Sequence, residues 1–205
     1  LLFSYVGQFM YEGDSPLAER RAAALSLDAS LLAELLGRVE LRDLLDAAVV
    51  ADTETELQRL APDRKARDKE GVADLLRLLG PLTTAELEAR CETPEAAAGW
   101  VADLVSDRRA LEVSFAGSSW WVAIEDASRL RDALGVPLPI GVPDAFIEPV
   151  EDPMGDLVSR YARTHGPFSV ADVAGRFGVG SAVARDVLLR LAAAKRVVEG
   201  EFRPG

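Results

Sequence analysis

Two stretches of this chain match one another at a constant separation of 86 residues, and this internal repeat limits the folds that the sequence can adopt. Residues 80–91 read Gly-Pro-Leu-Thr-Thr-Ala-Glu-Leu-Glu-Ala-Arg-Cys, and residues 166–177 read Gly-Pro-Phe-Ser-Val-Ala-Asp-Val-Ala-Gly-Arg-Phe. With a slip of one residue the match continues, so that the pair 108–109 corresponds to the pair 195–196. The sequence therefore predicts two copies of one structural unit.

Each copy predicts the same order of helices. An apolar helix precedes the Gly-Pro pair, over residues 72–79 in the first copy and 157–162 in the second. A short helix follows, opened by a Ser or Thr N-cap with an acid three residues later. These pairs are Thr83 with Glu86 and, in a weaker version with the shorter side chain, Ser169 with Asp172. A turn and a longer helix that ends in two basic residues complete each copy.

A β-hairpin is predicted after the helices of the first copy. Residues 110–115 and 120–124 have the composition of strands and flank a Gly-Ser-Ser turn, and residues 197–202 begin a similar pattern in the second copy. Helix, helix-turn-helix and hairpin is the order of a winged helix. The predicted fold is mainly α with small β wings (α+β), with a helical N-terminal segment followed by two tandem winged-helix modules.

The boundaries follow from these patterns and from five prolines between the copies. They are a helical segment at 1–69, a first winged helix at 70–126, a Pro-rich strap at 127–153 and a second winged helix at 154–205, truncated at its wing. The prolines predict that the strap is ordered and extended.

Composition excludes several classes of protein. Of the 205 residues, 49% are hydrophobic, yet no apolar run is long enough to span a bilayer, so we expect no membrane partner. One Cys and one His exclude a disulfide framework and an ordinary zinc site. Cys91 corresponds to Phe177 in the repeat, which predicts a core position for both. The sequence contains no secretory signal, and a cytoplasmic bacterial protein is expected.

The net charge of −11 is distributed unevenly. Residues 1–69 carry −4, residues 70–153 carry −10 and residues 154–205 carry +3. A strongly acidic chain is not typical of a general nucleic-acid coat, because its field repels phosphate. Only the last segment has a charge that favours contact with nucleic acid.

Specific sequence blocks lie in the first sixty residues. The most distinctive is Met10-Tyr-Glu-Gly-Asp-x-Pro-x-Ala-Glu-Arg-Arg21, and further blocks are Leu35-Leu-Gly37, Glu40-Leu-Arg42 and Glu56-Leu-Gln-Arg-Leu60. They resemble the large helicase-related (Lhr) family of superfamily 2 ATP-dependent DNA helicases. The resemblance extends over the whole chain and implies the end of the helicase-associated region followed by the start of a C-terminal winged-helix extension.

This resemblance implies a parent protein that uses ATP to move 3′ to 5′ along single-stranded DNA and acts in DNA repair. The sequence has no Gly-x-x-x-x-Gly-Lys-Ser/Thr run and no helicase motor motif, so ATP and Mg²⁺ are expected in motor domains upstream. We therefore expect no catalysis and no cofactor in this fragment. The implied partners are DNA or an RNA–DNA hybrid, the motor domains and a second copy of the chain. The extension also resembles winged-helix arrays of some bacterial DNA glycosylases, but their Gln-x-Gln/Asp signature is absent.

Basic residues of the second copy are the candidates for nucleic-acid contact. In the long helix at about 181–195, helical spacing predicts a core face of Val183, Ala184, Val187, Leu188 and Leu191. That helix has no Asn or Gln for reading bases, so contact with the phosphate backbone of the nucleic acid is favoured. The candidates are Arg176, Arg185, Arg190, Lys195, Arg196 and Arg203.

Trp120 and Trp121 lie in the predicted wing, where strand alternation points one ring inward and the other outward. Trp120 is the candidate for the outward ring, which either stacks on a base or packs against a neighbouring domain outside this sequence. Packing is the favoured of the two.

The first long helix, at about 94–106, carries Glu95 and Asp103, and no basic residue occurs in it before Arg108. We therefore expect this helix to pack within the protein rather than to bind phosphate. His165 is expected in a turn or at the surface.

Because winged helices also bind proteins, the alternative function is an interaction scaffold for self-assembly or partner docking.

Overall fold

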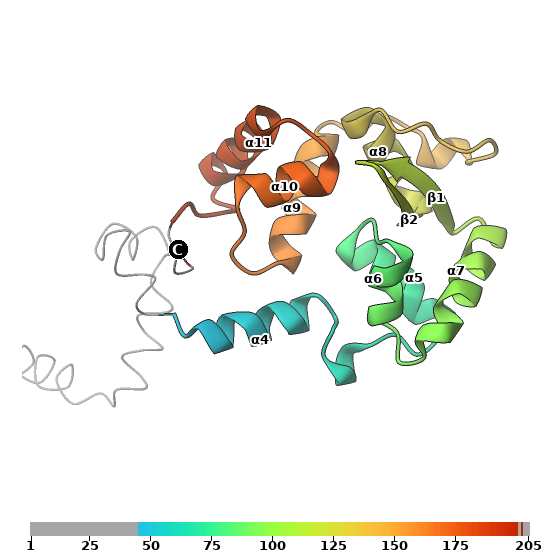
Figure 1. The fold of residues 1–205 in the computed structure, drawn as a ribbon. Helices are drawn as coiled ribbons and strands as arrows, with labels where there is room; N and C mark the ends of the chain where they lie inside the picture. The colour runs from blue at the N-terminus through green and yellow to red at the C-terminus, as the bar shows by residue number, and fades with distance from the viewer. Residues whose placement is uncertain (1–44, 201, 203–205) are drawn as a thin grey trace, which may run out of the picture. The chain divides into compact units, whose positions relative to one another are not determined.

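The computed structural model describes residues 45–200 and residue 202. Most of the helical segment predicted over residues 1–69, together with the candidate Arg203, lies outside these residues. None of the described helices is long and apolar enough to span a bilayer. In chain order the elements (Figure 1) are α4 (Ala47–Leu57), η1 (Pro62–Arg64), α5 (Lys69–Leu79), α6 (Thr84–Ala89), η2 (Pro94–Ala96), α7 (Ala97–Ser106), β1 (Ala110–Phe115), β2 (Ser118–Ala123), η3 (Ile124–Asp126), α8 (Ala127–Leu134), η4 (Asp144–Phe146), α9 (Pro153–Thr164), α10 (Val170–Phe177) and α11 (Ser181–Ala193).

The first repeat contains α5, α6 and α7 followed by the β1–β2 hairpin. Asp68 caps α5 by accepting a hydrogen bond from the Gly71 N–H at 2.8 Å, which satisfies one of the free donors at the helix start. Apolar residues at helical spacing then bury one face of α5. The core of this repeat is formed by Val72, Leu75, Leu76, Leu79, Leu82, Leu87, Cys91, Val101 and Leu104, with smaller side chains around them.

The second repeat contains α9, α10 and α11 and reproduces local details of the first. Both predicted capping boxes are present, at the starts of α6 and α10. The Asp172 carboxylate accepts the Ser169 N–H at 2.7 Å, so the shorter side chain still closes its box. Cys91 and Phe177 are both buried, which confirms their predicted core positions.

The repeat also extends to the backbone at the ends of the two long helices. Arg108 and Lys195 both adopt left-handed conformations, with φ of 57° and 56°. In each case the next residue donates its N–H back into the helix, Arg109 to the Leu104 carbonyl at 2.8 Å and Arg196 to the Leu191 carbonyl at 2.9 Å. Two helices that end in the same way show that the repeat seen in sequence is a repeat of structure.

The predicted hairpin is confirmed. β1 and β2 pair antiparallel, with Val113 opposite Trp120, and the turn between them has positive φ at Ala116 and Gly117. Leu82 adds a short third segment, because its N–H and carbonyl bond to the backbone of Trp121 at 3.0 and 2.8 Å. A hairpin joined to three helices in this way is a winged helix.

The two faces of the hairpin belong to different hydrophobic cores. One face carries Trp121, which packs against the core of the first repeat. The opposite face is larger, and it packs with α8 and with α9, α10 and α11 of the second repeat. Its residues are Leu111, Val113, Trp120 and Val122, with Phe115 packed at the edge. The wing of the first repeat therefore completes the core of the second.

One expectation about the second half of the chain needs correction, and a second is not confirmed. Residues 127–134 of the predicted extended strap form the helix α8, which buries Ala127 and Leu130 and ends at Gly135. The second repeat forms three helices, and no strand follows them in residues 194–200. A second wing, and with it a second complete winged helix, stays a prediction.

Gly178 lies where the second repeat contacts the hairpin turn. Its φ of 66° favours glycine, and a Cβ there would come within 2.9 Å of the Cα of Ala116. We expect Gly178→Ala to lower the free energy of unfolding by about 1–2 kcal/mol from the backbone and by about 1 kcal/mol or more from the collision. Gly135 is a matched control, because its φ is 65° and a Cβ there meets nothing within 4 Å. Equal losses for the two variants in urea denaturation would contradict the contact.

Candidate nucleic-acid interface

The candidate interface is the exposed side of α11. The helix buries Ala184, Val187 and Leu191 against the second repeat. Val183, predicted to be in the core face, is instead 50% exposed, and Leu189 is 56% exposed. The core stripe is thus narrower than the sequence indicated, and α11 shows solvent a surface of mixed apolar and basic character.

Three of the predicted cations lie free on this surface. Arg185, Lys195 and Arg196 are exposed. Within residues 45–200, no ion pair or side-chain hydrogen bond engages any of the three. Lys195 and Arg196 stand directly after α11, where the left-handed turn at Lys195 ends the helix. We call these three side chains the α11 cationic edge. Among residues 45–200 it has no partner that phosphate would have to displace.

Arg190 is less available, because two carboxylates already pair with it. Its guanidinium is 3.1 Å from Asp152 and 3.4 Å from Asp186. Its side chain remains 51% exposed, and exposed pairs of this kind contribute only about 0–1 kcal/mol. Phosphate would have to compete with two negative charges at this position, so Arg190 is a weaker candidate than the α11 cationic edge.

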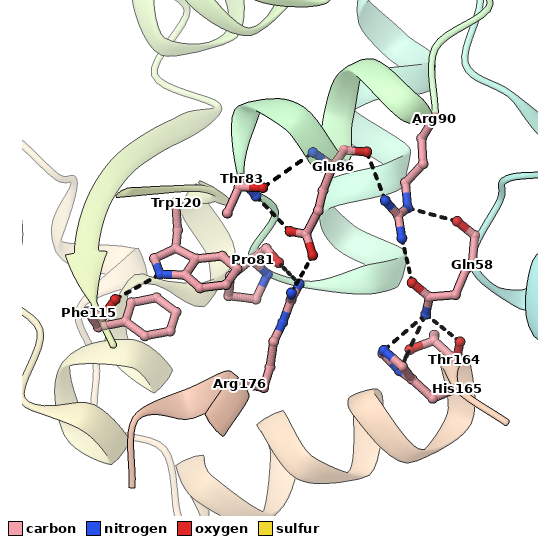
Figure 2. Close-up of polar contacts among 10 residues, drawn as sticks. All are labelled: Gln58, Pro81, Thr83, Glu86, Arg90, Phe115, Trp120, Thr164, His165 and Arg176. Atoms are coloured by element: carbon pink, nitrogen blue, oxygen red, sulfur yellow. Dashed lines mark hydrogen bonds and ion pairs between the residues drawn. The ribbon is translucent and has the colours of Figure 1, made fainter. Parts of the chain in front are cut away.

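Arg176 has a structural role that its sequence position did not reveal. Its guanidinium pairs with the Glu86 carboxylate at 2.5 Å and donates to the Pro81 carbonyl at 2.6 Å, both in the first repeat (Figure 2). It also lies over the Trp120 ring, 4.5 Å from the ring centroid. These contacts hold α10 against the first repeat. Arg176 is therefore a weaker candidate for nucleic-acid contact than the α11 cationic edge, and its contact with nucleic acid stays a prediction.

Trp120 is likewise occupied. The residue is 6% exposed, its indole N–H donates to the Phe115 carbonyl at 2.9 Å, and its ring stacks on Phe115 with 4.9 Å between centroids. A base cannot stack on a ring that is covered in this way. The favoured expectation of packing describes Trp120 better, although the surface that covers it is the second repeat of this same chain.

A second group of polar contacts joins the end of α4 to both repeats. Arg90, at the repeat position equivalent to Arg176, donates to the Gln58 carbonyl at 2.8 Å and to Gln58 Oε1 at 2.5 Å. The Gln58 amide in turn donates to the Thr164 carbonyl at 2.5 Å and lies 3.3 Å from the His165 ring (Figure 2). We call Gln58, Glu86, Arg90, Thr164, His165 and Arg176 the inter-repeat network.

Glu86 is the acidic centre of this network. Burial raises the pKa of its carboxyl, but the hydrogen bond and charge of Arg176, with smaller effects of the Thr83 N–H and of Arg90, lower the pKa below its ordinary value. Glu86 is therefore ionised at neutral pH and pairs with Arg176. The sequence pattern indicated only a capping box for Glu86 and no role for Gln58 or Arg90. The one available signal was that arginines occupy the same position in both repeats.

Comparison with known proteins agrees with this architecture. Residues 43–149, more than half of the chain, match the family model of the large helicase-related protein winged-helix domain. The chain belongs to the Lhr family. It is 62% identical over 98% of its length to a Mycolicibacterium smegmatis protein named Lhr helicase/probable uracil glycosylase, and 44% identical over 93% of its length to an Escherichia coli protein named Lhr helicase/uracil glycosylase. It spans 13% and 12% of the lengths of these Lhr relatives.

His165 gives the inter-repeat network a pH dependence. Its Nδ1 lies 2.8 Å from the Tyr161 carbonyl, which can only accept, so Nδ1 carries the proton and Nε2 faces the Gln58 amide as an acceptor. Burial has the largest effect on the pKa of His165 and lowers it, and the charges of Arg176 and Arg90 lower it further. The Tyr161 carbonyl and the charge of Glu54 raise the pKa. The net result is a pKa below the ordinary value of 6.5.

We expect acid to weaken the fold through this histidine. Because the pKa of His165 is lower in the folded chain, the unfolded chain binds more protons as the pH falls through about 6.5, and the free energy of unfolding decreases. The His165→Asn variant should lose less stability than the wild type between pH 7.5 and 5.5 in urea denaturation. An identical decrease for both proteins would show that His165 does not couple to folding.

Proposed function

We propose that this chain is a non-catalytic accessory region of an Lhr-like ATP-dependent 3′–5′ DNA helicase that guides nucleic acid and organises the C-terminal region, in the context of DNA repair. The observation that carries this proposal is the α11 cationic edge. It consists of three exposed basic side chains that have no acidic partner in residues 45–200, in a chain whose net charge is −11. Such side chains are those that neutralise phosphate and release its counterions.

The chemistry of α11 supports contact with the phosphate backbone of nucleic acid rather than with the edges of its bases. The helix contains no Asn or Gln, and its basic residues stand at its side and just beyond its end. Lys and Arg in such places position nucleic acid without reading its sequence. DNA and an RNA–DNA hybrid both fit this description.

The inter-repeat network supports a positioning role. It ties α4, the first repeat and the second repeat together through buried or half-buried charged hydrogen bonds, and the shared hairpin adds an apolar core across the same boundary. An edge held on such a support keeps a fixed place relative to the first repeat. Guidance of a strand toward or away from a motor needs this kind of fixed geometry.

ATP and Mg²⁺ belong, in this proposal, to motor domains elsewhere in the parent protein. The sequence of this chain has no phosphate-binding loop, and we assign it no step of ATP hydrolysis. The names of the two Lhr relatives also include uracil glycosylase, and this sequence lacks the Gln-x-Gln/Asp signature of that chemistry. We propose no catalytic residue in this chain.

The second candidate function is a protein-interaction scaffold, favoured by the exposed apolar residues of α11. Val183 is 50% and Leu189 56% exposed, and both lie on the same helix as the cations. Self-assembly or docking of another domain would cover them. In that case the cations next to them would form the polar rim of a protein interface.

The proposal predicts that charge reversal on the α11 cationic edge weakens binding of nucleic acid. We expect the wild type to bind labelled single-stranded and 3′-tailed duplex DNA at low salt in fluorescence anisotropy, and the variant Arg185→Glu/Lys195→Glu/Arg196→Glu to lose at least about tenfold in affinity. Arg108→Glu is the matched control, because Arg108 is exposed and holds the equivalent place to Lys195 in the first repeat. A folded wild type that does not bind would favour the scaffold function.

A further inference from the structure

A second basic surface lies between α4 and α5, separate from α11. An open pocket of about 520 Å³ is lined by four basic side chains of residues 59–67 and by residues of α5. Two carboxylates, those of Asp63 and Asp74, also line it, so the cations are in excess by two. The surrounding segment, residues 70–153, carries a net charge of −10. We call the four side chains the α4–α5 basic pocket: Arg59, Arg64, Lys65 and Arg67.

Backbone contacts hold the loop that carries these side chains. Ala66 is 6% exposed, donates its N–H to the Arg90 carbonyl at 2.9 Å and accepts the Glu92 N–H at 2.8 Å. Because the backbone is extended here, Lys65 and Arg67 on either side of Ala66 share the opposite, outward face. The loop also lies directly on α5, since a Cβ at Gly71 would be 3.0 Å from that of Ala66. The cations are thus carried by a loop that is hydrogen-bonded to the first repeat and packed on α5.

The internal partners of these cations are weak or absent. Arg64 lies 3.5 Å from Asp63, and Arg67 lies 3.1 Å from Glu92 with both side chains more than half exposed. Exposed pairs of this kind contribute about 0–1 kcal/mol and exchange readily for another anion. Within the described residues, Arg59 and Lys65 form no ion pair. Although Asp63 and Asp74 also line the pocket, it keeps an excess of positive charge that is not paired within the described residues.

The apolar part of the pocket lining indicates which kind of anion the pocket favours. Leu75 and Leu78 of α5 line it, and Leu78 is 39% exposed. A free phosphate ion would contact only the cations at the rim, whereas a nucleotide unit brings both a phosphate and an apolar base face. Unpaired bases offer that face, which is hidden in a duplex.

We propose that the α4–α5 basic pocket binds single-stranded nucleic acid, with phosphates on Arg64, Lys65 and Arg67 and a base against Leu78. It would be a second contact on the first repeat, separate from the α11 cationic edge, and it rests on the proposed function for the choice of nucleic acid as partner. The acidic remainder of the first repeat repels phosphate elsewhere, so the strand is confined to this pocket.

The test is an NMR titration of the ¹⁵N-labelled 205-residue chain with a thymidine decanucleotide, and in parallel with inorganic phosphate at the same phosphate concentration. We expect the amide signals of residues 59–67 and of Leu78 to shift with the oligonucleotide and far less with phosphate. Equal shifts with both would mean an anion site only, and no shift in this loop would also overturn the proposal.

Two variants separate this proposal from the function assigned to α11. Arg64→Glu/Lys65→Glu should abolish the shifts of the loop and leave those of residues 185–196, and the triple reversal on α11 should do the opposite. Both sets of substituted side chains are at least partly exposed, so a folded protein is expected and circular dichroism checks it. Shifts on α11 alone would refute the pocket and keep the proposed function, while shifts in the loop alone would refute the role of α11.

Discussion

Replacement of Trp120 by alanine is expected to lower the free energy of unfolding by about 4 kcal/mol, because a large aromatic side chain would leave the core. Trp120 is 6% exposed and stands on the face of the hairpin that completes the core of the second repeat. Its removal takes away the stacking partner of Phe115 and the surface beneath Arg176, and it opens a cavity between the two repeats. The measurement is urea denaturation followed by circular dichroism.

A Trp120→Phe variant is the control for this experiment. Phenylalanine keeps an aromatic ring in the core and loses the hydrogen bond from the indole N–H to the Phe115 carbonyl, so a loss of about 1 kcal/mol is expected, plus a small term for volume. If Trp120→Ala lost no more than Trp120→Phe, the hairpin would not be a shared element of both cores.

The second large effect is expected for Arg90→Met, with a loss of about 3 kcal/mol in the free energy of unfolding. Arg90 is 6% exposed and donates to two oxygens of Gln58 and to the carbonyl of Glu86, the last at 2.8 Å. Methionine fills much of the volume but leaves these buried acceptors without a donor, at about 1–3 kcal/mol for each one that water does not reach. Urea denaturation at pH 7.5 measures the loss.

Arg77→Met on the surface of α5 is the matched substitution. Arg77 pairs with Asp74 and Glu125, but its side chain is 42% exposed, so water replaces the lost partners and a change below about 1 kcal/mol is expected. Similar losses for Arg77→Met and Arg90→Met would mean that the inter-repeat network is no stronger than a surface ion pair.

Much of the fold was predictable because its signals are local. The capping boxes at Thr83 and Ser169, the Gly-Pro turns and the alternation around Gly117 each act over a few residues, and the repeat made them consistent with one another. The helix α8 was missed although its signals were present, since Leu130 is part of an amphipathic stretch and Gly135 follows as a stop. The prolines farther along the segment suggested an extended chain instead.

The candidate site was harder to predict, because its residues are selected by partners far away in sequence. An arginine on a helix looks free until its partner is known, and the partner of Arg176 is Glu86, 90 residues earlier. In the same way, alternation shows that one face of a hairpin is buried but does not show what covers it. Arg185, Lys195 and Arg196 remain as candidates because no such distant partner reaches them within residues 45–200.

The salt dependence of DNA binding tests the central claim most directly. For a single strand, each phosphate contact contributes about 0.7 to the slope of log K against log salt. Neutralisation of the α11 cationic edge by Arg185→Gln/Lys195→Gln/Arg196→Gln should therefore reduce the slope measured for the wild type by about 2. An unchanged slope in the folded triple variant would contradict the account, because the α11 cationic edge would then carry no contact with phosphate.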